Sequence, residues 1–526
     1  MRLQRSDIHR YIYILGLTGM AMSLTLSLYV MSVAQFVLLA NWLAEGRLAA
    51  KFKAFFHNKA ALVFTLLYLL HVVGLFCTHD FETALAELRI KLPLLALPVI
   101  LSTSPALSGK TLNNILLAHI AGTFISGVYS FYLFHSGPVQ DIRDIFIISH
   151  IRYSLNVCTD IFILLYFIFY KNNYKTGIKI FFSVLSAWFI YYLFFMESFT
   201  GMVLLITTLA VVLVYFVFKQ SKPVYKISLL AFFMVMVSGS ALYVHHIYEK
   251  YINIDSVNPQ KLEQFTRHGN PYVHDLKNPM TDNGHYTWIY VCESELKEAW
   301  DKRSKIKYGE NDAADSPVKY TLVRYLTSKG LKKDSYGVNS LSDEEIKLIE
   351  QGVANVDDAK KSNFENRLKN LLWEIEIYKF TRDPRQQTLM QRVELWRTSA
   401  RLIKDHFWFG LGTGDVKNVF AAKLELDDSL LKNSGLRPHN QYLTIMLEFG
   451  VFGLLLFLFC LFYPSLRQKN FFDFLYLTFF IVVVFSMLTE DTFETQAGVT
   501  YFAYFSCLLL FVQKNALSEN KTLILE

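Results

Sequence analysis

Three side chains that can handle an anion and a proton lie together near the C-terminal end of the chain. Arg437, His439 and Asn440 close a long polar segment, and a largely apolar run follows at once. Pro438 cannot continue a preceding helix, and Asn440 suits the N-cap of a helix that begins at Gln441. The unpaired N–H groups and positive dipole end of such a helix attract anions, above all a phosphate. The stretch predicts a histidine base beside a phosphate, although a helix cap with a surface histidine has the same pattern.

Other charged residues are predicted at the same face of the protein. Arg152 opens an apolar run, and Arg392 lies on an amphipathic stretch with apolar residues at spacings of three and four. Charged groups at membrane depth are costly and therefore usually paired or functional. An isolated arginine can also extend its side chain to the membrane–water interface. Glu197, Glu490 and Asp491 are acidic candidates in short turns, which ordinary solvated turns would also explain.

A glycine-rich turn after the amphipathic stretch adds two backbone candidates. Gly412 and Gly414 would let backbone amide groups approach a phosphate. A glycine-rich run of this kind more often only ends a helix and begins a loop. The chain has no Asp-x-Asp, no Walker loop and no His-Glu-x-x-His. We therefore expect no metal and no cofactor, with arginines neutralising a diphosphate in place of a divalent cation.

The elements that must position these residues are membrane helices. The chain has 526 residues, 53% of them hydrophobic and 16% aromatic, and long uncharged runs recur. That pattern is typical of an all-α polytopic membrane protein. Nothing resembles a nucleic-acid-binding module, so the net charge of +7 is expected to act through its location in loops. We predict about twelve spans, at Tyr11–Tyr29, Met31–Ala44, Ala60–Cys77, Lys91–Ser104, Leu112–Phe134, His150–Tyr170, Ile178–Met196, Thr200–Phe218, Ile227–Ile247, Gln441–Tyr463, Phe471–Leu488 and Ala497–Val512.

Basic loops set the orientation of these spans. With twelve spans, the basic loops after the second, sixth, eighth and tenth fall on one side, which should be cytoplasmic. Three parts are then predicted: an N-terminal bundle of about nine helices (1–247), a large external loop domain (248–438), and C-terminal membrane helices with a cytoplasmic tail (439–526). The external segment should be folded, because it carries aromatic residues and a capping-box pattern at Ser342–Glu345.

These stretches resemble a known family. His439-Asn440, followed after nine residues by Gly450-Val451-Phe452-Gly453, resembles the signature of the O-antigen ligase and O-antigen polymerase superfamily. The stretch from Arg392 to Gly414 resembles that family's second recurrent segment. Residues 150–154 and 490–498 are similar to variants in ligase-like proteins of Bacteroidetes-type bacteria, whereas residues 258–363 look like an insertion.

The resemblance implies a bundle of the glycosyltransferase C kind, metal-independent, in the bacterial inner membrane with its active site facing the periplasm. Such enzymes take a glycan from an undecaprenyl diphosphate carrier and attach it to an acceptor. His439 matches the family histidine that activates the acceptor hydroxyl, and Arg392 matches the external arginine that holds the diphosphate. Arg437, Arg152 and Asn440 are further candidates for diphosphate contacts. Many members carry Ser-Arg-Gly where this chain has Ser198-Phe199-Thr200-Gly201, so the arginine of that turn is missing here.

The acceptor decides between alternatives within the family. We expect a ligase that uses the lipid A-core acceptor, with a polymerase that joins repeat units or a protein O-oligosaccharyltransferase as alternatives. A non-enzyme alternative is a flippase or transporter for a lipid-linked sugar, which needs polar residues deep in both halves of the bundle. Glu448 is the deep residue that the sequence shows, without an evident counterpart. It lies roughly 13 Å along the helix from His439 and on the opposite face, so it should pair within the bundle.

Overall fold

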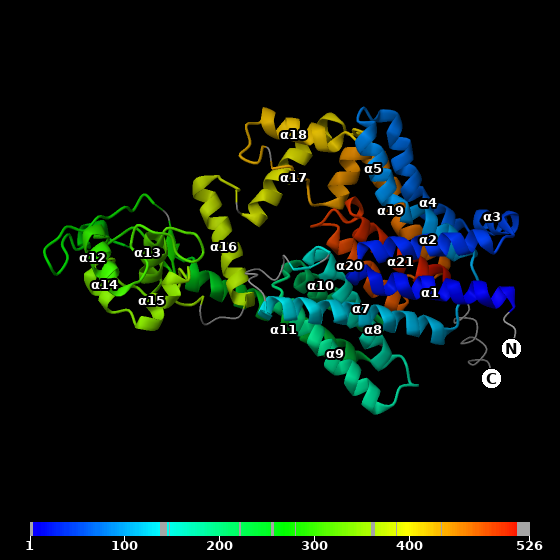
Figure 1. Ribbon diagram of the computed structural model, residues 1–526, viewed down its shortest axis with the longest axis horizontal. Helices are drawn as coiled ribbons and strands as arrows, with labels where there is room; N and C mark the ends of the chain where they lie inside the picture. Colours follow the sequence, from blue (N-terminus) through cyan, green and yellow to red (C-terminus); the bar gives the residue numbers. More distant parts are fainter. Residues whose placement is uncertain are drawn as a thin grey trace. The chain divides into compact units, whose positions relative to one another are not determined.

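A computed structural model of the chain describes residues 4–136, 145–146, 148–219, 222–253, 257–278, 280–358, 363–385, 387–432 and 434–512, without the side chains of 363, 364 and 367. The structure is mostly helical, as predicted, and its sheet is one short hairpin of β1 (Thr281–Asp282) and β2 (His285–Tyr286) in the described chain (Figure 1). Two compact units form: Met1–Lys219 with Arg392–Glu526, and Gln220–Gln391. The predicted cytoplasmic tail after residue 512 lies outside the described residues. The predicted three-part division across a membrane stays a prediction.

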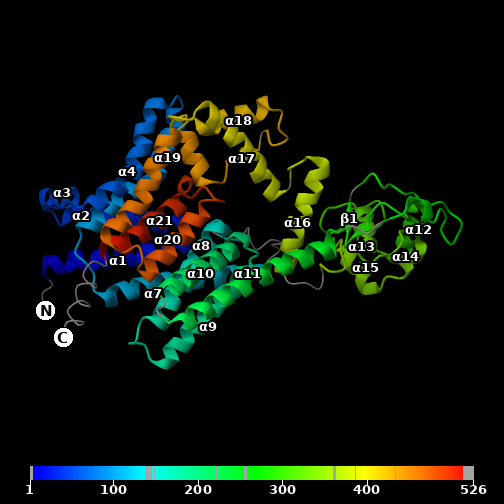
Figure 2. The ribbon, with the colours of Figure 1, turned by 180° about the vertical axis from the view of Figure 1, so that it is seen from behind.

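The first unit is a helical bundle. Its elements are α1 (Arg5–Leu26), α2 (Leu28–Ala44), α3 (Leu48–His57), α4 (Lys59–Val73), η1 (Gly74–Cys77), α5 (Phe81–Lys91), α6 (Pro93–Thr103), α7 (Gly109–Ser136), α8 (His150–Phe169), α9 (Thr176–Phe195), α10 (Phe199–Lys219), the greater part of α17 (Thr388–Asp405), α18 (Val416–Leu426), α19 (Gln441–Gln468), α20 (Phe474–Ser486), η4 (Thr492–Glu494), α21 (Gln496–Cys507) and η5 (Leu508–Val512). Helices α9, α10 and α20 pack on α8, and α19 packs on α4 (Figure 2). Every residue of α21 from Ala497 to Cys507 is buried, as expected of a helix that is apolar all round.

Seven helices among the described residues are long and apolar enough to cross a membrane, or eight if α2 and α3, bent by 112°, form one span. Lys59–Cys77 is the first of them and Gln441–Gln468 the last. Seven of the twelve predicted spans fall on these seven helices, and Met31–Ala44 falls on α2. The predicted span Tyr11–Tyr29 runs past the end of α1 at Leu26 into α2, and α20 and the run Gln496–Val512 are shorter apolar helices. The predicted span Lys91–Ser104 is divided, because α5 ends at Lys91 and α6 begins at Pro93. The count of twelve therefore stays a prediction.

Helix α19 is broken in its middle by a glycine. Gly450 has φ 64° and ψ −165°, inside what is otherwise a continuous helix. A Cβ at this position would lie 2.3 Å from the backbone of Trp408, so only a glycine fits. The predicted helix from Gln441 to about Tyr463 is thus two helical segments that meet at a kink.

The glycine-rich turn after α17 supplies the hydrogen bonds that the kink removes. The N–H of Val451 donates to the carbonyl of Phe407 at 2.8 Å, and the carbonyl of Glu448 accepts from the N–H of Gly412 at 2.8 Å. Backbone groups freed from a helix must find other partners when they are buried. The turn is therefore a structural brace for α19.

We expect Gly450→Ala to lower the stability of the bundle by about 2 kcal/mol or more, because it adds backbone strain and a clash with Trp408. Thermal unfolding of the purified protein in detergent measures this. Gly19→Ala is the matched control, since Gly19 lies within α1 and a Cβ there meets nothing within 4 Å. Equal melting temperatures for the two variants would contradict the proposed role of the kink.

The second unit opens with the long apolar helix α11 (Pro223–Tyr251). Its other elements are η3 (Pro259–Lys261), the β1–β2 hairpin, α12 (Glu293–Arg303), α13 (Val318–Ser328), α14 (Ser335–Asn339), α15 (Asp343–Glu350) and α16 (Asn363–Thr381), with the first turn of α17. A core around Trp300, Leu322 and Leu326 is fully buried. The predicted capping box at Ser342–Glu345 is confirmed at the start of α15. The segment is folded, as predicted, although residues 279 and 359–362 of the suspected insertion lie outside the described residues.

Candidate active site

The acidic turn between α20 and α21 is buried. Glu490, Asp491 and Glu494 expose 6%, 5% and 9% of their surfaces. The alternative of an ordinary solvated turn is therefore wrong for this segment. Burying a carboxylate is costly unless it is paired, so the partners of these three side chains define what the turn does.

Asp491 holds the start of α19. Its carboxylate accepts hydrogen bonds from the backbone N–H groups of His439 at 3.0 Å and Asn440 at 2.9 Å, and from the hydroxyl of Thr444 at 2.9 Å. The positive end of this helix thus has an anion already, a side chain of the protein itself. The phosphate that we expected at these amides would have to bind elsewhere, because the turn that carries Asp491 folds back over the helix start.

His439 sits in a strained turn between two anchors. Its φ is +50°, a left-handed conformation that is uncommon for a residue with a side chain. Asp491 holds its N–H, and the indole N–H of Trp396 on α17 donates to the carbonyl of Pro438 at 2.9 Å. The half-buried imidazole makes no hydrogen bond to another residue that the structure describes. Its ring nitrogens are therefore available to a substrate.

Asn440 is the N-cap of α19, as predicted. Its side-chain oxygen accepts from the N–H of Leu443 at 3.1 Å, and its side-chain nitrogen donates to the carbonyl of Leu488 at 3.0 Å. Both ends of the amide are thus used within the protein. Asn440 is placed to position His439 by fixing where the helix starts.

Arg392 reaches the acidic turn from α17. Its Nη2 lies 2.8 Å from Glu490 Oε1, and its side chain is 22% exposed. One hydrogen bond leaves most of the five guanidinium N–H donors for a further partner. Burial raises the pKa of Glu490, and the charges of Arg152 and Arg392 oppose part of that shift, with His439 adding to them. Arg392 thus pairs with a carboxylate whose neighbour in the chain, Asp491, holds the backbone of His439.

Arg152 also contacts the acidic turn. It is buried at the start of α8, and its Nη2 donates to the carbonyl of Asp491 at 2.8 Å. Its Nη1 lies 3.4 Å from the hydroxyl of Thr492. These contacts hold the backbone of the turn, and with it the carboxylates of Glu490 and Asp491.

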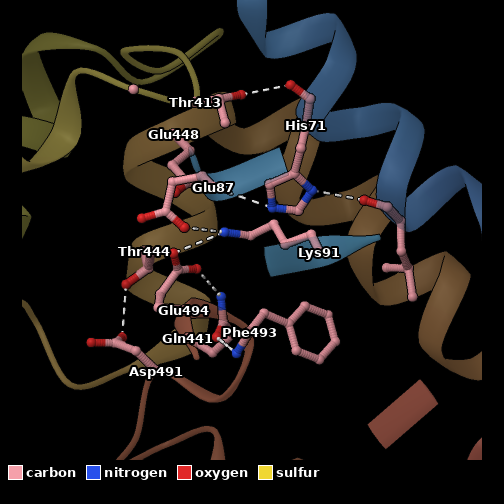
Figure 3. Close-up of polar contacts among 12 residues, drawn as sticks. His71, Glu87, Lys91, Thr413, Gln441, Thr444, Glu448, Asp491, Phe493 and Glu494 are labelled. Atoms are coloured by element: carbon pink, nitrogen blue, oxygen red, sulfur yellow. Dashed lines mark hydrogen bonds and ion pairs between the residues drawn. The ribbon is translucent and has the colours of Figure 1, made fainter. Parts of the chain in front are cut away.

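A network of alternating charges lies beside the start of α19. Arg437 donates to Glu494 at 3.2 Å and to Glu87 at 2.9 Å. The fully buried ammonium of Lys91 donates to the same two carboxylates, at 2.9 Å and 2.7 Å (Figure 3). Burial would raise the pKa of Glu494, but the charges of Lys91 and Arg437 outweigh it and hold the pKa below its ordinary value. Gln441 adds a 3.2 Å hydrogen bond to Glu494.

Glu87 and Lys91 were not predicted from the sequence. They form an i, i+4 pair on α5, directly before an apolar run, and that local pattern was the signal available. Their partner Glu494 is some 400 residues further along the chain, so the pattern did not connect them to His439. Lys91 was instead the first residue of the predicted span Lys91–Ser104.

Glu448 pairs inside the bundle, as predicted. Its Oε2 lies 3.6 Å from Nε2 of His71 on α4, and both side chains are buried (Figure 3). The sequence showed no counterpart for this deep residue. The structure shows a second deep histidine–carboxylate pair. His119 on α7 and Asp160 on α8 are fully buried, and Nε2 of His119 lies 3.5 Å from Oδ1 of Asp160.

The remaining candidates lie in turns. The N–H groups of Gly412 and Gly414 are bonded to the carbonyl of Glu448 and, at 3.4 Å, to the hydroxyl of Thr78. They are thus occupied by the protein's own acceptors. Glu197 lies half-buried in the turn between α9 and α10 with φ 52°, and its part in the site stays a prediction. No group of three metal-binding side chains occurs among the described residues.

The apolar helices and the buried charges that they enclose are those of a multi-pass membrane protein. Residues 351–458 match the family model described as O-Antigen ligase. The match covers about a fifth of the chain, includes Arg392, Arg437 and His439, and confirms the O-antigen ligase and polymerase superfamily that the motifs predicted. Members of this family are membrane glycosyltransferase-like enzymes, which implies lipid-linked glycans and lipid acceptors as substrates. No curated protein matches the chain.

Proposed function

We propose that this protein is an O-antigen ligase that transfers a glycan from undecaprenyl diphosphate to the lipid A-core acceptor. The observation that carries the proposal is the acidic turn itself: Arg392 pairs with Glu490, Arg437 pairs with Glu494, and Asp491 holds the backbone of His439. A base and a group of cations side by side are what a transfer reaction with a diphosphate leaving group needs. The proposed location is the bacterial inner membrane, with this turn facing the periplasm and residues 248–438 outside.

The proposed reaction is a direct displacement. The hydroxyl of the acceptor sugar gives its proton to His439 as its oxygen attacks the anomeric carbon of the donor. The bond from that carbon to the diphosphate oxygen breaks, and undecaprenyl diphosphate leaves with its electron pair. Arg392 and Arg437 stabilise the charge that develops on the leaving group, because both are partly exposed beside His439's turn. Protonated His439 then returns its proton to solvent.

Arg152 and Asn440 take positioning roles in this scheme. Both side chains make hydrogen bonds within the protein. Arg152 donates to the acidic turn, and Asn440 bonds to the start of α19 and to Leu488. Asp491 acts with them, since it fixes the backbone of His439. Catalytic geometry has to be held by such supporting contacts.

Lipopolysaccharide gel analysis of a deletion strain tests the assignment. Loss of the whole ladder with an intact core supports the ligase. A core that bears a single repeat supports a polymerase. An unaltered ladder with altered glycoproteins supports a protein O-oligosaccharyltransferase, and either of these last two outcomes overturns the choice of acceptor.

We expect Arg392→Lys to reduce transfer strongly even though the positive charge is kept. A lysine is a point charge and cannot make the paired hydrogen bonds that an arginine offers to a phosphate or to Glu490. Product formation by purified protein measures the effect. Arg385→Lys is the matched control, because that exposed arginine pairs with Asp383 on the other unit. Full activity in Arg392→Lys would remove Arg392 from the site.

The two deep histidine–carboxylate pairs, His71–Glu448 and His119–Asp160, are an observation in favour of a second candidate, a transporter of lipid-linked glycans. An experiment in detergent distinguishes the two functions, because no membrane then lies between donor and acceptor. The proposed ligase forms product there, and we expect Asp160→Asn to form it at the same rate, because Asp160 lies on α8 and pairs with His119 on α7. The transporter is supported if no product forms and if vesicles that contain the Asp160→Asn variant no longer move the lipid-linked glycan across their membrane.

A further inference from the structure

The second unit contains a cavity that the proposed transfer reaction does not use. Its volume is about 570 Å³, within the range of about 300–1,000 Å³ that small-ligand sites occupy. The lining comes from the end of α11, the β1–β2 hairpin, α13, the loop after α15, and α16. All these segments belong to Gln220–Gln391, so the cavity is internal to this unit.

Two planar side chains form a fixed wall of the cavity. Arg324 donates to both oxygens of Asp282, through Nε at 3.1 Å and Nη2 at 3.0 Å, and Asp282 is 5% exposed. The guanidinium carbon of Arg324 lies 5.8 Å from the centre of the Trp373 ring. A bidentate pair of this kind is rigid, and it still leaves guanidinium donors unused.

Side-chain amides continue this wall. Asn355 donates to the side-chain oxygen of Asn283 at 3.0 Å, and Asn283 donates to the carbonyl of Ser328 at 3.0 Å. Asn370 lies on the exposed face of α16, three residues before Trp373, and lines the same cavity. Amide groups offer donors and acceptors side by side, which suits a ligand that carries both on neighbouring atoms.

The charges of the lining disfavour an anion. Three carboxylates, Asp282, Asp358 and Glu374, line the cavity with two cations, Arg324 and Lys369. Asp282 and Asp358 pair with those cations directly. A phosphate would thus meet carboxylates and cations that are already neutralised, whereas an uncharged ligand rich in hydroxyl groups meets fixed donors and acceptors.

We propose that this cavity binds a saccharide, with the C–H face of an uncharged sugar ring against Trp373 and its hydroxyl groups on Arg324, Asp282 and the asparagine amides. An aromatic face with convergent planar polar groups matches the two sides of a sugar, one apolar and one polar. The site goes beyond the proposed transfer reaction, since it needs neither His439 nor a lipid diphosphate.

Saturation-transfer difference NMR on the full-length protein, in a detergent without a sugar headgroup, tests the proposal. The probes are the methyl glycosides of glucose, galactose, mannose and N-acetylglucosamine, each alone. We expect at least one to bind, and Trp373→Ala to weaken that binding by about tenfold or more. Asn370→Trp fills the cavity from an exposed helix position and should abolish the signal without disturbing the fold.

Two further variants test whether the sugar is held by this cavity and by no other part of the protein. Tyr336→Ala removes an exposed aromatic ring of the same unit outside the cavity and should leave binding unchanged. His439→Ala should also bind the sugar normally, so failure of the transfer reaction and failure of this site are distinguishable. The proposal is overturned if none of the four sugars binds, if binding survives both cavity variants, or if inorganic phosphate displaces the sugar.

Discussion

His439→Ala abolishes glycan transfer while the protein is still made and folded: this is the result we expect from the site. General base catalysis contributes about 10²–10⁴-fold to such reactions, so removal of the base should leave at most a small residue of the activity. The ring makes no hydrogen bond to another described residue, so its removal should leave the turn intact. The backbone contact to Asp491 that places residue 439 does not depend on the side chain.

The measurement is the rate of product formation by purified protein from a lipid-linked glycan, with the lipopolysaccharide ladder as the cellular readout. His268→Ala is the matched control, because His268 is exposed in the second unit and lies outside the cavity described there. The melting temperature of His439→Ala should equal that of the unaltered protein. A fully active His439→Ala protein would remove the base and, with it, the proposed mechanism.

We expect the second large effect from Lys91→Met, this time on stability. Lys91 is fully buried and neutralises Glu87 and Glu494, so its loss leaves the two carboxylates with one cation, Arg437. Removing one partner of a buried ion pair typically costs about 3–5 kcal/mol, because an uncompensated charge stays in the interior. Thermal unfolding in detergent should show a markedly lower melting temperature and a lower yield of folded protein.

A double variant shows whether charge balance is the cause. Lys91→Met with Glu494→Gln restores neutrality around Arg437 and Glu87, and the glutamine can still bond to Gln441. We expect it to recover much of the lost stability. Lys53→Met, at an exposed position on α3, controls for the loss of a lysine as such. If the double variant unfolds as early as the single one, the network does not act through its charges.

The local elements of the site were predictable because their causes are local. Asn440 caps a helix that begins at Gln441, as its amide chemistry and the following apolar run indicated. The pairing of Glu448 inside the bundle followed from helical geometry. The motif of His439 and Asn440 with Gly450 predicted the family, which the match over residues 351–458 confirms.

The sequence by itself thus determined the helical class, the apolar helices, the cap at Asn440 and the family. Only the tertiary structure decided that Asp491 occupies the amides at the start of α19, and that Glu87 and Lys91 join Arg437. The physical reason is that helix periodicity and capping depend on neighbours within a few residues, whereas a buried carboxylate finds its cation wherever the packed bundle brings one within about 3 Å. Such a partner can lie hundreds of residues away, and no local pattern identifies it.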